Sequence, residues 1–324
     1  MSDAKPEIRP SFQPRPEDWT FDLDRALSAV VSLRSRVPDD AFTAAVLGTQ
    51  REGQGVMIRE DGLVLTIGYL VTEASSIWLT ANNGQAVSAH LVGYDQASGL
   101  GLVQALGRLD IPALEIGSVD ALRVGDKALV AAQGGRKHAS RVQVVAKREF
   151  AGSWEYVLDE AIFTSPPHPT WSGAALVDRD GRLAGIGSLY MRQVMPGNEE
   201  VDGNMIVPID LLQPILDDLL MYGRVQRPPR PWLGMTVAET ENCLVVAGTY
   251  DGGPARRAGV ETGDIVLGLD GSPVRDLAGF FRRVWALGTA GVDVPLHLVR
   301  DGARVDVSVR SADRHSFLKA PRLH

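Results

Sequence analysis

Residues 169–177 read PTWSGAALV: a serine followed by glycine and small residues, and then by an apolar run. This order is typical of a turn that presents a nucleophilic serine and continues into a buried strand. Ser172 is therefore the candidate nucleophile. Gly173 supplies the backbone freedom that a tight turn needs.

Short apolar segments on both sides of this turn predict an all-β fold. Residues 55–66 read as a hairpin with its turn at Asp61-Gly62, and Asp180-Gly181 marks another hairpin. Many short strands with few helical periods favour closed barrels over a parallel sheet. Further strands are predicted at 76–79, 86–92, 100–106, 126–132, 142–148, 156–163, 174–178 and 183–190.

The segments that flank these strands predict the limits of the domain. Prolines and charges interrupt residues 1–22, which predicts an irregular N-terminal arm, and 22–33 read as a short helix entering a strand. Apolar residues at helical spacing over 206–220 predict a helix that closes the domain. A proline-rich, basic stretch at 223–231 predicts a stiff linker, and 314–324 a disordered tail.

The residues beyond the linker read RPWLGMTV, then GGPARRAGVETGDIVLGLDGSPV, then a helical LAGFFRRVWALG. This order resembles a PDZ domain as bacterial proteases carry it. The glycines of GDIVLGLDG are structural turns, because no GK[ST] follows them as it would in a phosphate-binding loop.

Together, the serine turn and this C-terminal order resemble the HtrA (Deg) family of trypsin-fold proteases with PDZ domains. The family loop reads Asn-Pro-Gly-Asn-Ser-Gly-Gly-Pro-Leu-Val, so Ser172 matches the nucleophile and Gly173 the glycine after it. Thr170 replaces a glycine, Trp171 an asparagine, and Ala174-Ala175 a Gly-Pro pair. The resemblance implies a trypsin-like double six-stranded antiparallel β-barrel at 23–222, followed by one small α+β PDZ domain at 232–313.

The family's histidine and aspartate are both absent. TIGYLV matches the family's Thr-Asn-x-His-Val-Val and puts Tyr69 in place of the histidine. GYDQASGLGLV puts Gly99 in place of the aspartate and keeps Asp95 at an earlier, non-catalytic position. A phenol with a pKa near 10 is deprotonated in roughly one part in a thousand at neutral pH, and Gly99 cannot orient it.

The loop before the serine departs from the family independently. An oxyanion hole uses backbone N–H groups held in a conformation that glycine reaches cheaply. Thr170 is β-branched and disfavours a positive φ. The losses at Tyr69, Gly99 and Thr170 all predict that Ser172 is not activated.

One histidine could replace the missing base. His168 is four residues before Ser172 and is the candidate within sequence reach. The alternative is a structural histidine in a turn between Pro167 and Pro169.

The PDZ resemblance implies a site for peptide C-termini. The backbone N–H groups of Leu233, Gly234 and Met235, next to Trp232, would receive a terminal carboxylate, and the peptide would add as an edge strand. The helix that begins at 277 would form the groove wall, unless its apolar residues are simply core. The predicted wall residues are Leu277, Phe280, Phe281 and Val284.

Composition and charge limit the partners. A net charge of −7 argues against a nucleic acid or an anionic membrane surface, and no apolar run is long enough to span a bilayer. The single Cys243 forms no internal disulfide. The sequence predicts no metal and no cofactor. Because the first 30 residues contain no apolar signal core, we expect a cytoplasmic protein.

These features lead to a hypothesis with two alternatives. The first is an HtrA-like homologue without proteolytic activity that acts as a PDZ peptide-binding scaffold, adaptor or regulator. The alternatives are an active serine endopeptidase with an atypical site, serving protein quality control, and a chaperone-like holder of unfolded chains. The resemblance also implies a homotrimer formed through the first barrel and the N-terminal arm.

Overall fold

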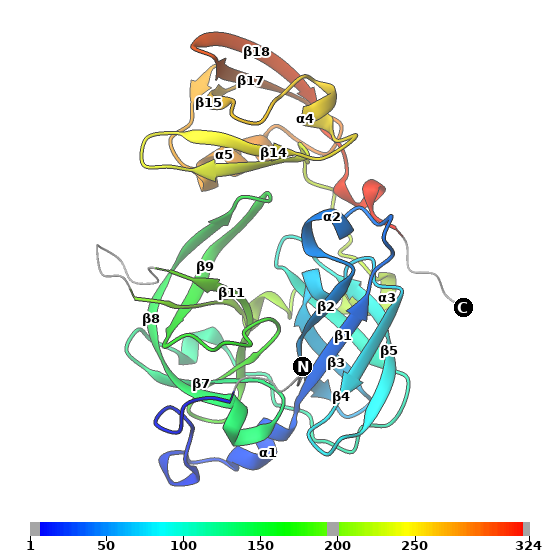
Figure 1. Cartoon of the computed structure of the whole chain (residues 1–324), viewed down its shortest axis with the longest axis vertical. Coiled ribbons are helices and arrows are strands. Elements are labelled where there is room, and N and C mark those ends of the chain that lie inside the picture. Colours follow the sequence, from blue (N-terminus) through cyan, green and yellow to red (C-terminus); the bar gives the residue numbers. More distant parts are fainter. Residues whose placement is uncertain (1–6, 193–200, 320–324) are drawn as a thin grey trace. The chain divides into compact units, whose positions relative to one another are not determined.

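The computed structural model describes residues 7–192 and 201–319, which form two compact units (Figure 1). The first unit holds residues 1–148, 160–225 and 319–324, and the second holds 149–159 and 226–318. Parts of two predicted segments, residues 1–6 of the arm and 320–324 of the tail, lie outside the described residues.

The first unit contains two closed six-stranded barrels. In the first barrel the strand order is β1-β2-β3-β6-β5-β4, and in the second it is β10-β11-β12-β9-β8-β7. The strands of the first barrel are β1 (Val30–Arg36), β2 (Gln50–Arg59), β3 (Leu63–Ile67), β4 (Ser76–Thr80), β5 (Ala86–Tyr94) and β6 (Leu100–Ala105). The strands of the second are β7 (Lys127–Ala131), β8 (Ala139–Gly152), β9 (Tyr156–Ser165), β10 (Ala175–Val177), β11 (Leu183–Met191) and β12 (Gly203–Pro208).

The hydrophobic pattern explains the barrels. Every residue of β3, β10 and β12 is buried, whereas buried and exposed residues alternate in the C-terminal part of β1. The first hairpin turns at Gly62, whose φ of 92° is open to glycine. The predicted helix before β1 is α1 (Leu23–Ser28), and the Asp22 carboxylate caps it by accepting the N–H of Arg25 at 3.0 Å.

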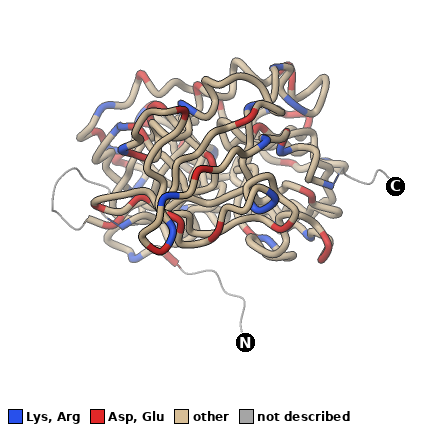
Figure 2. Tube along the Cα trace, turned by 90° about the horizontal axis from the view of Figure 1, so that it is seen from above, with Lys and Arg blue, Asp and Glu red and all other residues tan. Residues whose placement is uncertain are grey.

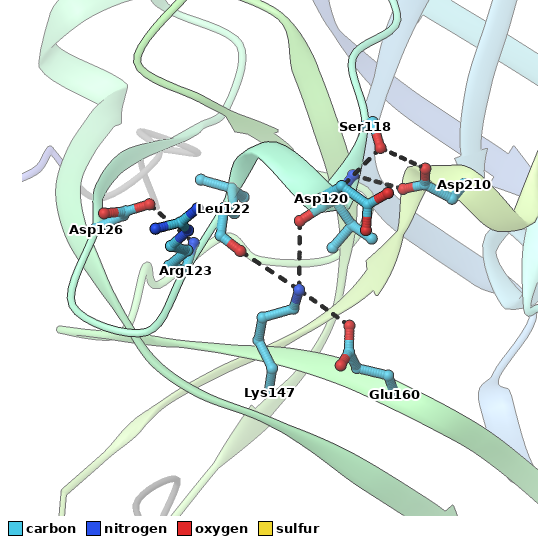
Figure 3. Close-up of polar contacts among 9 residues, drawn as sticks. Ser118, Asp120, Leu122, Arg123, Asp126, Lys147, Glu160 and Asp210 are labelled. Atoms are coloured by element: carbon cyan, nitrogen blue, oxygen red, sulfur yellow. Dashed lines mark hydrogen bonds and ion pairs between the residues drawn. The ribbon is translucent and has the colours of Figure 1, made fainter.

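A polar network fixes the connection between the barrels (Figure 3). Asp210 accepts the Ser118 hydroxyl at 2.7 Å and the Val119 N–H at 2.6 Å, at the start of the 3-10 helix η3 (Val119–Ala121). Lys147 on β8 donates to the carbonyl oxygens of Val119 and Leu122 and pairs with Glu160 of β9 at 3.0 Å. These contacts tie the connecting segment to the second barrel, and Leu122 of this segment is buried in the core of that barrel.

The remaining helices of the first unit are short: η1 (Pro16–Asp18), α2 (Ala44–Leu47), η2 (Gly68–Leu70), η4 (Gly135–His138), η5 (Ile209–Leu211) and α3 (Leu216–Tyr222). The helix predicted over 206–220 is therefore wrong in its first part, where β12 and η5 lie. Pro208 and Pro214 explain the difference, because proline lacks an N–H and disfavours helical backbone in the residue before it.

The second unit is a small α+β domain. Its sheet has the order β13-β14-β15-β17-β18, with β16 paired to β15, so β13 is an edge strand. The helix α5 (Leu277–Ala286) begins after Asp276, whose carboxylate accepts the Gly279 N–H. The other elements are β13 (Met235–Glu239), β14 (Leu244–Thr249), α4 (Pro254–Arg257), β15 (Ile265–Leu269), β16 (Ser272–Pro273), β17 (Asp293–Arg300), β18 (Ala303–Arg310) and η6 (Arg314–Phe317).

The predicted disordered tail is wrong for its described part. Residues 314–317 form η6, and the Phe317 ring packs on Trp232 with ring centroids 4.9 Å apart. Lys319 donates its backbone N–H to the Glu73 carboxylate at 2.8 Å. Aromatic packing and these hydrogen bonds order the segment, although its polar composition predicted disorder.

Lysine and arginine are interspersed with aspartate and glutamate over the described chain (Figure 2). No helix among the described residues is long and apolar enough to cross a membrane.

Candidate functional site

The turn that carries Ser172 is held by backbone contacts on both sides. The Gln54 N–H, from β2, donates to the Ser172 carbonyl at 2.8 Å, and the Gly173 N–H donates to the Gly187 carbonyl, from β11, at 2.8 Å. Gly173 has a φ of 75°, and a Cβ at this position would lie 2.0 Å from the Gln54 carbonyl oxygen. Only glycine therefore fits, and the Ser-Gly pair fixes the turn against both barrels.

Ser172 and Tyr69 form a hydroxyl pair. Tyr69 lies in η2, directly after β3, and its hydroxyl is 2.8 Å from Ser172 Oγ and 2.7 Å from the Ser188 carbonyl oxygen. A phenol has one proton, and a carbonyl oxygen only accepts. When Tyr69 donates to Ser188, the Ser172 hydroxyl is left to donate to the phenol oxygen.

The environment keeps this phenol protonated. Burial raises the pKa of Tyr69 to about 12, and the hydrogen bond with Ser172 only partly opposes that rise. A neutral phenol whose oxygen already takes part in two hydrogen bonds is a poor proton acceptor. The Tyr69 hydroxyl therefore offers Ser172 a hydrogen bond from a protonated phenol.

Gly99, at the family's aspartate position, has no side chain that could pair with a base, and it contributes backbone hydrogen bonds. It has a φ of 79°, its N–H donates to the Asp95 carbonyl at 2.8 Å, and its carbonyl accepts the Gly68 N–H at 2.7 Å. The buried Asp95 carboxylate accepts the Ser98 N–H at 2.8 Å. Asp95 therefore shapes the turn before β6, and neither residue presents a carboxylate to Tyr69.

His168 takes up the N–H group that an oxyanion hole would use. In trypsin-like chemistry the hole consists of the N–H of the serine and that of the residue two positions before it. Here that residue is Thr170, whose N–H points at Nδ1 of His168 at a distance of 3.1 Å. His168 Nε2 lies 3.1 Å from the His138 carbonyl oxygen, so Nε2 carries the proton and Nδ1 accepts.

Both ring nitrogens of His168 are therefore committed to structural hydrogen bonds, and the ring is fully buried. Burial lowers its pKa to about 4, against a smaller opposing effect of the His138 carbonyl. His168 is neutral at pH 7, but its one acceptor nitrogen, Nδ1, already accepts the Thr170 N–H and is not free to take a proton from Ser172. It acts as a structural residue of the turn.

Thr170 does not adopt a positive φ, as is expected of a β-branched residue. Among the described residues, positive φ values outside glycine are found at Glu73, Glu155, Asp270 and Asp301. The loop avoids the positive φ by turning the Thr170 N–H toward His168. Trp171 packs beside Tyr190 of β11, with ring centroids 5.8 Å apart.

The predicted carboxylate loop lies at the start of the second unit. Gly234 has a φ of 71°, and Trp232 packs beside Tyr250 and Phe317. The N–H groups of Leu233 and Gly234 converge, and both donate to the carboxylate of Glu155 at 3.0 Å. Sequence reasoning missed Glu155, because it lies nearly 80 residues earlier, at the tip of a hairpin.

The predicted wall residues lie in the interior. Leu277 is 4% exposed, and Phe280, Phe281 and Val284 are fully buried, within one hydrophobic cluster of the second unit. Ala151 and Val157, beside the hairpin tip, pack against the same cluster. With the hairpin tip in place, all four side chains are buried within this cluster.

Comparison with known families agrees with both units. Residues 53–186 match a trypsin-like peptidase domain, and residues 231–310 match a PDZ domain. A probable periplasmic serine endoprotease DegP-like from Pseudomonas fulva is 30% identical over 285 residues, 81% of this chain and 57% of that protein. The Escherichia coli periplasmic pH-dependent serine endoprotease DegQ is 26% identical over 315 residues, 89% of this chain and 68% of that protein.

Solved structures share the fold. The HtrA-type protease AlgW with a decapeptide has a TM-score of 0.52 and 23% identity, covering 93% of this chain and 98% of that one. The serine endoprotease from Yersinia pestis has a TM-score of 0.50 and 23% identity, covering 89% and 95%. The chain spans a little over half the length of the first curated relatives.

The predicted cytoplasmic location is wrong, because the curated relatives that the chain matches are named periplasmic endoproteases. The trypsin-like double barrel followed by a PDZ domain, by contrast, is confirmed. The fold and the similarities together show a trypsin-like peptidase domain followed by one PDZ domain, an architecture similar to that of HtrA-type proteases.

Proposed function

We propose that this chain is a proteolytically inactive HtrA homologue that acts as a PDZ-based scaffold, adaptor or regulator. The observation that carries the proposal is the partner of Ser172. Its hydroxyl meets a neutral phenol at 2.8 Å, where an activated serine needs a base. The engagement of the Thr170 N–H by His168 adds an independent reason, since it removes one oxyanion donor.

An active serine endopeptidase is the second candidate. The names of the curated relatives favour it, because they are serine endoproteases and the chain keeps a serine and a glycine at the matching turn. An activity of this kind would require the Tyr69 hydroxyl to leave Ser172 and a base to enter from elsewhere.

Reaction with a fluorophosphonate probe separates the two candidates, because only an activated serine reacts. The whole chain should label no more than its Ser172→Ala variant, and it should not degrade unfolded casein. Trypsin treated in parallel shows that the probe is competent. Labelling or casein cleavage that is lost in Ser172→Ala would overturn the proposal.

Peptides or protein C-termini are the proposed partners of the second unit. The converging N–H groups of Leu233 and Gly234 support this, since they are the type of donors that receive a terminal carboxylate. Holding of unfolded chains would use the same residues. The relatives' names further suggest a periplasmic protein, serving protein quality control. The assembly proposed from the family resemblance is a homotrimer, which sedimentation of the whole chain would test.

A further inference from the structure

The tip of the β8–β9 hairpin belongs to the second unit, although the strands that carry it belong to the first. Residues 149–159 group with 226–318. At this tip Glu155 has a φ of 61°, a conformation that is uncommon for a residue other than glycine. Such strain persists where the surroundings impose it, so the contacts of Glu155 need an explanation.

The Glu155 carboxylate occupies the predicted carboxylate loop. Its Oε1 accepts the Leu233 N–H at 3.0 Å and the Gly234 N–H at 3.0 Å, and its Oε2 lies 3.2 Å from the Leu233 nitrogen. The residue is only 8% exposed. The carboxylate thus sits where a terminal carboxylate would be received.

The backbone of the tip pairs with the edge of the PDZ sheet. Val237 of β13 donates its N–H to the Ser153 carbonyl at 3.0 Å, and β13 is the edge strand to which a peptide would add. A carboxylate in the loop and a backbone contact on the adjacent edge are the two interactions by which a PDZ domain holds a C-terminal peptide.

Side-chain contacts secure the tip on both flanks. Ala151 and Val157 pack against the hydrophobic cluster that contains the α5 residues. Arg282 of α5 pairs with Asp159 at 2.5 Å and also with Glu149. The tip therefore packs against the apolar cluster that contains the α5 residues and pairs with the Arg282 guanidinium, as the side chains of a bound peptide would.

We propose that the hairpin tip is an internal ligand, with Glu155 filling the carboxylate-binding loop, so that C-terminal peptides must displace it to bind. The inference rests on the proposed peptide-binding function of the second unit. A peptide's apparent dissociation constant then exceeds its intrinsic one by the inverse of the fraction of molecules whose loop is open.

The energetics of the contact allow displacement. Burial raises the pKa of Glu155 to about 8, and the N–H groups of Leu233, Gly234 and Met235 together with the charge of Arg314 only partly oppose that rise. The loop therefore holds this carboxylate at an incompletely compensated desolvation cost. An α-carboxyl group is intrinsically more acidic than a glutamate side chain, so it retains its charge more readily in the same place.

The test uses the whole chain and a fluorescein-labelled pool of decapeptides ending in Val, Leu, Ile or Phe, as free acids and as C-terminal amides. Glu155→Ala should bind the free acids at least tenfold more tightly than wild type, with no gain for the amides. Glu155→Gln, which keeps an oxygen that can accept both N–H groups, should gain less than Glu155→Ala. Glu241→Gln, an exposed glutamate of the same unit, removes the same charge and should leave binding unchanged. Equal affinities of wild type and both Glu155 variants would overturn the proposal.

Hydrogen exchange gives a readout without peptide. Exchange at the Val237 amide should accelerate at least tenfold in Glu155→Ala, but not in Glu241→Gln, because docking of the tip protects that N–H. Unchanged protection in both Glu155 variants would overturn the internal-ligand proposal. Acceleration without any peptide binding would support the docked tip and overturn the proposed peptide-binding function instead, so the two failures are distinguishable.

Discussion

Replacing Tyr69 by phenylalanine tests whether the phenol stabilises the turn or serves as a base. The variant keeps the ring and deletes the hydroxyl that lies 2.8 Å from Ser172 Oγ and 2.7 Å from the Ser188 carbonyl oxygen. Ser188 is 4% exposed, so its carbonyl loses a partner where water replaces it poorly. Leaving a buried acceptor unsatisfied costs about 1–3 kcal/mol, and we expect about 2 kcal/mol for Tyr69→Phe.

In a unit of this size, 1 kcal/mol shifts the melting temperature by about 2–4 °C, so a fall of roughly 4–8 °C is expected. Differential scanning calorimetry of the whole chain measures it. The matched control is Tyr190→Phe, which deletes an exposed phenol hydroxyl bonded to Asp202 and should change stability by less than about 0.5 kcal/mol.

Two results would refute this reasoning. An unchanged melting temperature in Tyr69→Phe would mean that the hydroxyl pair does not stabilise the turn. A wild-type hydrolytic activity that vanishes in Tyr69→Phe would make Tyr69 the base and Ser172 an active nucleophile.

Three further predictions follow from the same geometry. Tyr69→His combined with Gly99→Asp should give little casein hydrolysis, because the Thr170 N–H is still donated to His168 and the loss of one oxyanion donor costs about 3–4 kcal/mol. Adding Thr170→Gly, Trp171→Asn and Ala174→Gly should raise the hydrolysis rate. Rapid casein hydrolysis by the double variant alone would contradict this prediction. His168 has its pKa lowered to about 4 in the folded state, so its contribution is fully present above the unfolded value of 6.5 and is lost as pH falls through 4. This contribution to the free energy of unfolding amounts to about 3 kcal/mol. In His168→Gln, which keeps an acceptor for the Thr170 N–H, the free energy of unfolding measured in urea should depend less on pH between 4 and 6.5 than in wild type. Gly234→Val should abolish binding of free-acid decapeptides in anisotropy titrations, because its Cβ would lie 2.9 Å from Pro254 Cδ at a φ of 71°; undiminished binding would mean that the loop is not the carboxylate receptor.

The sequence sufficed for the barrels because their signals are local. Turn glycines such as Gly62 and runs of buried residues such as β3 report directly on strands and hairpins. The helix predicted over 206–220 failed because apolar spacing alone does not register the two prolines that divide it.

The sites depend on contacts that no local pattern encodes. That Tyr69 would replace a histidine could be seen in the sequence, but its bond to the Ser188 carbonyl, 119 positions away, could not. The same holds for Glu155, whose acidic character is ordinary in a hairpin turn and acquires meaning only beside Leu233 and Gly234. Hydrogen bonds between residues this far apart in the chain cannot be predicted from local sequence patterns.

The turn that carries Ser172 has a structural role that does not depend on any reaction of its hydroxyl. The Ser172 carbonyl accepts the Gln54 N–H from the first barrel, and Gly173 fits where any Cβ would strike the Gln54 carbonyl. The backbone of this turn thus joins the two barrels whether or not the hydroxyl reacts.

At both the Ser172 turn and the PDZ carboxylate loop, side chains of the chain itself take the hydrogen bonds that a substrate or ligand would use. Tyr69 takes the hydroxyl of Ser172, His168 takes the Thr170 N–H, and Glu155 takes the N–H groups of the carboxylate loop. The difference lies in how each occupant could leave. Tyr69 and His168 are fixed by further hydrogen bonds to backbone carbonyls, whereas Glu155 lies at the end of a hairpin and at a strained φ of 61°. Ligand exchange is therefore expected at the PDZ loop and not at Ser172, which is why binding assays rather than hydrolysis assays should reveal what this protein does.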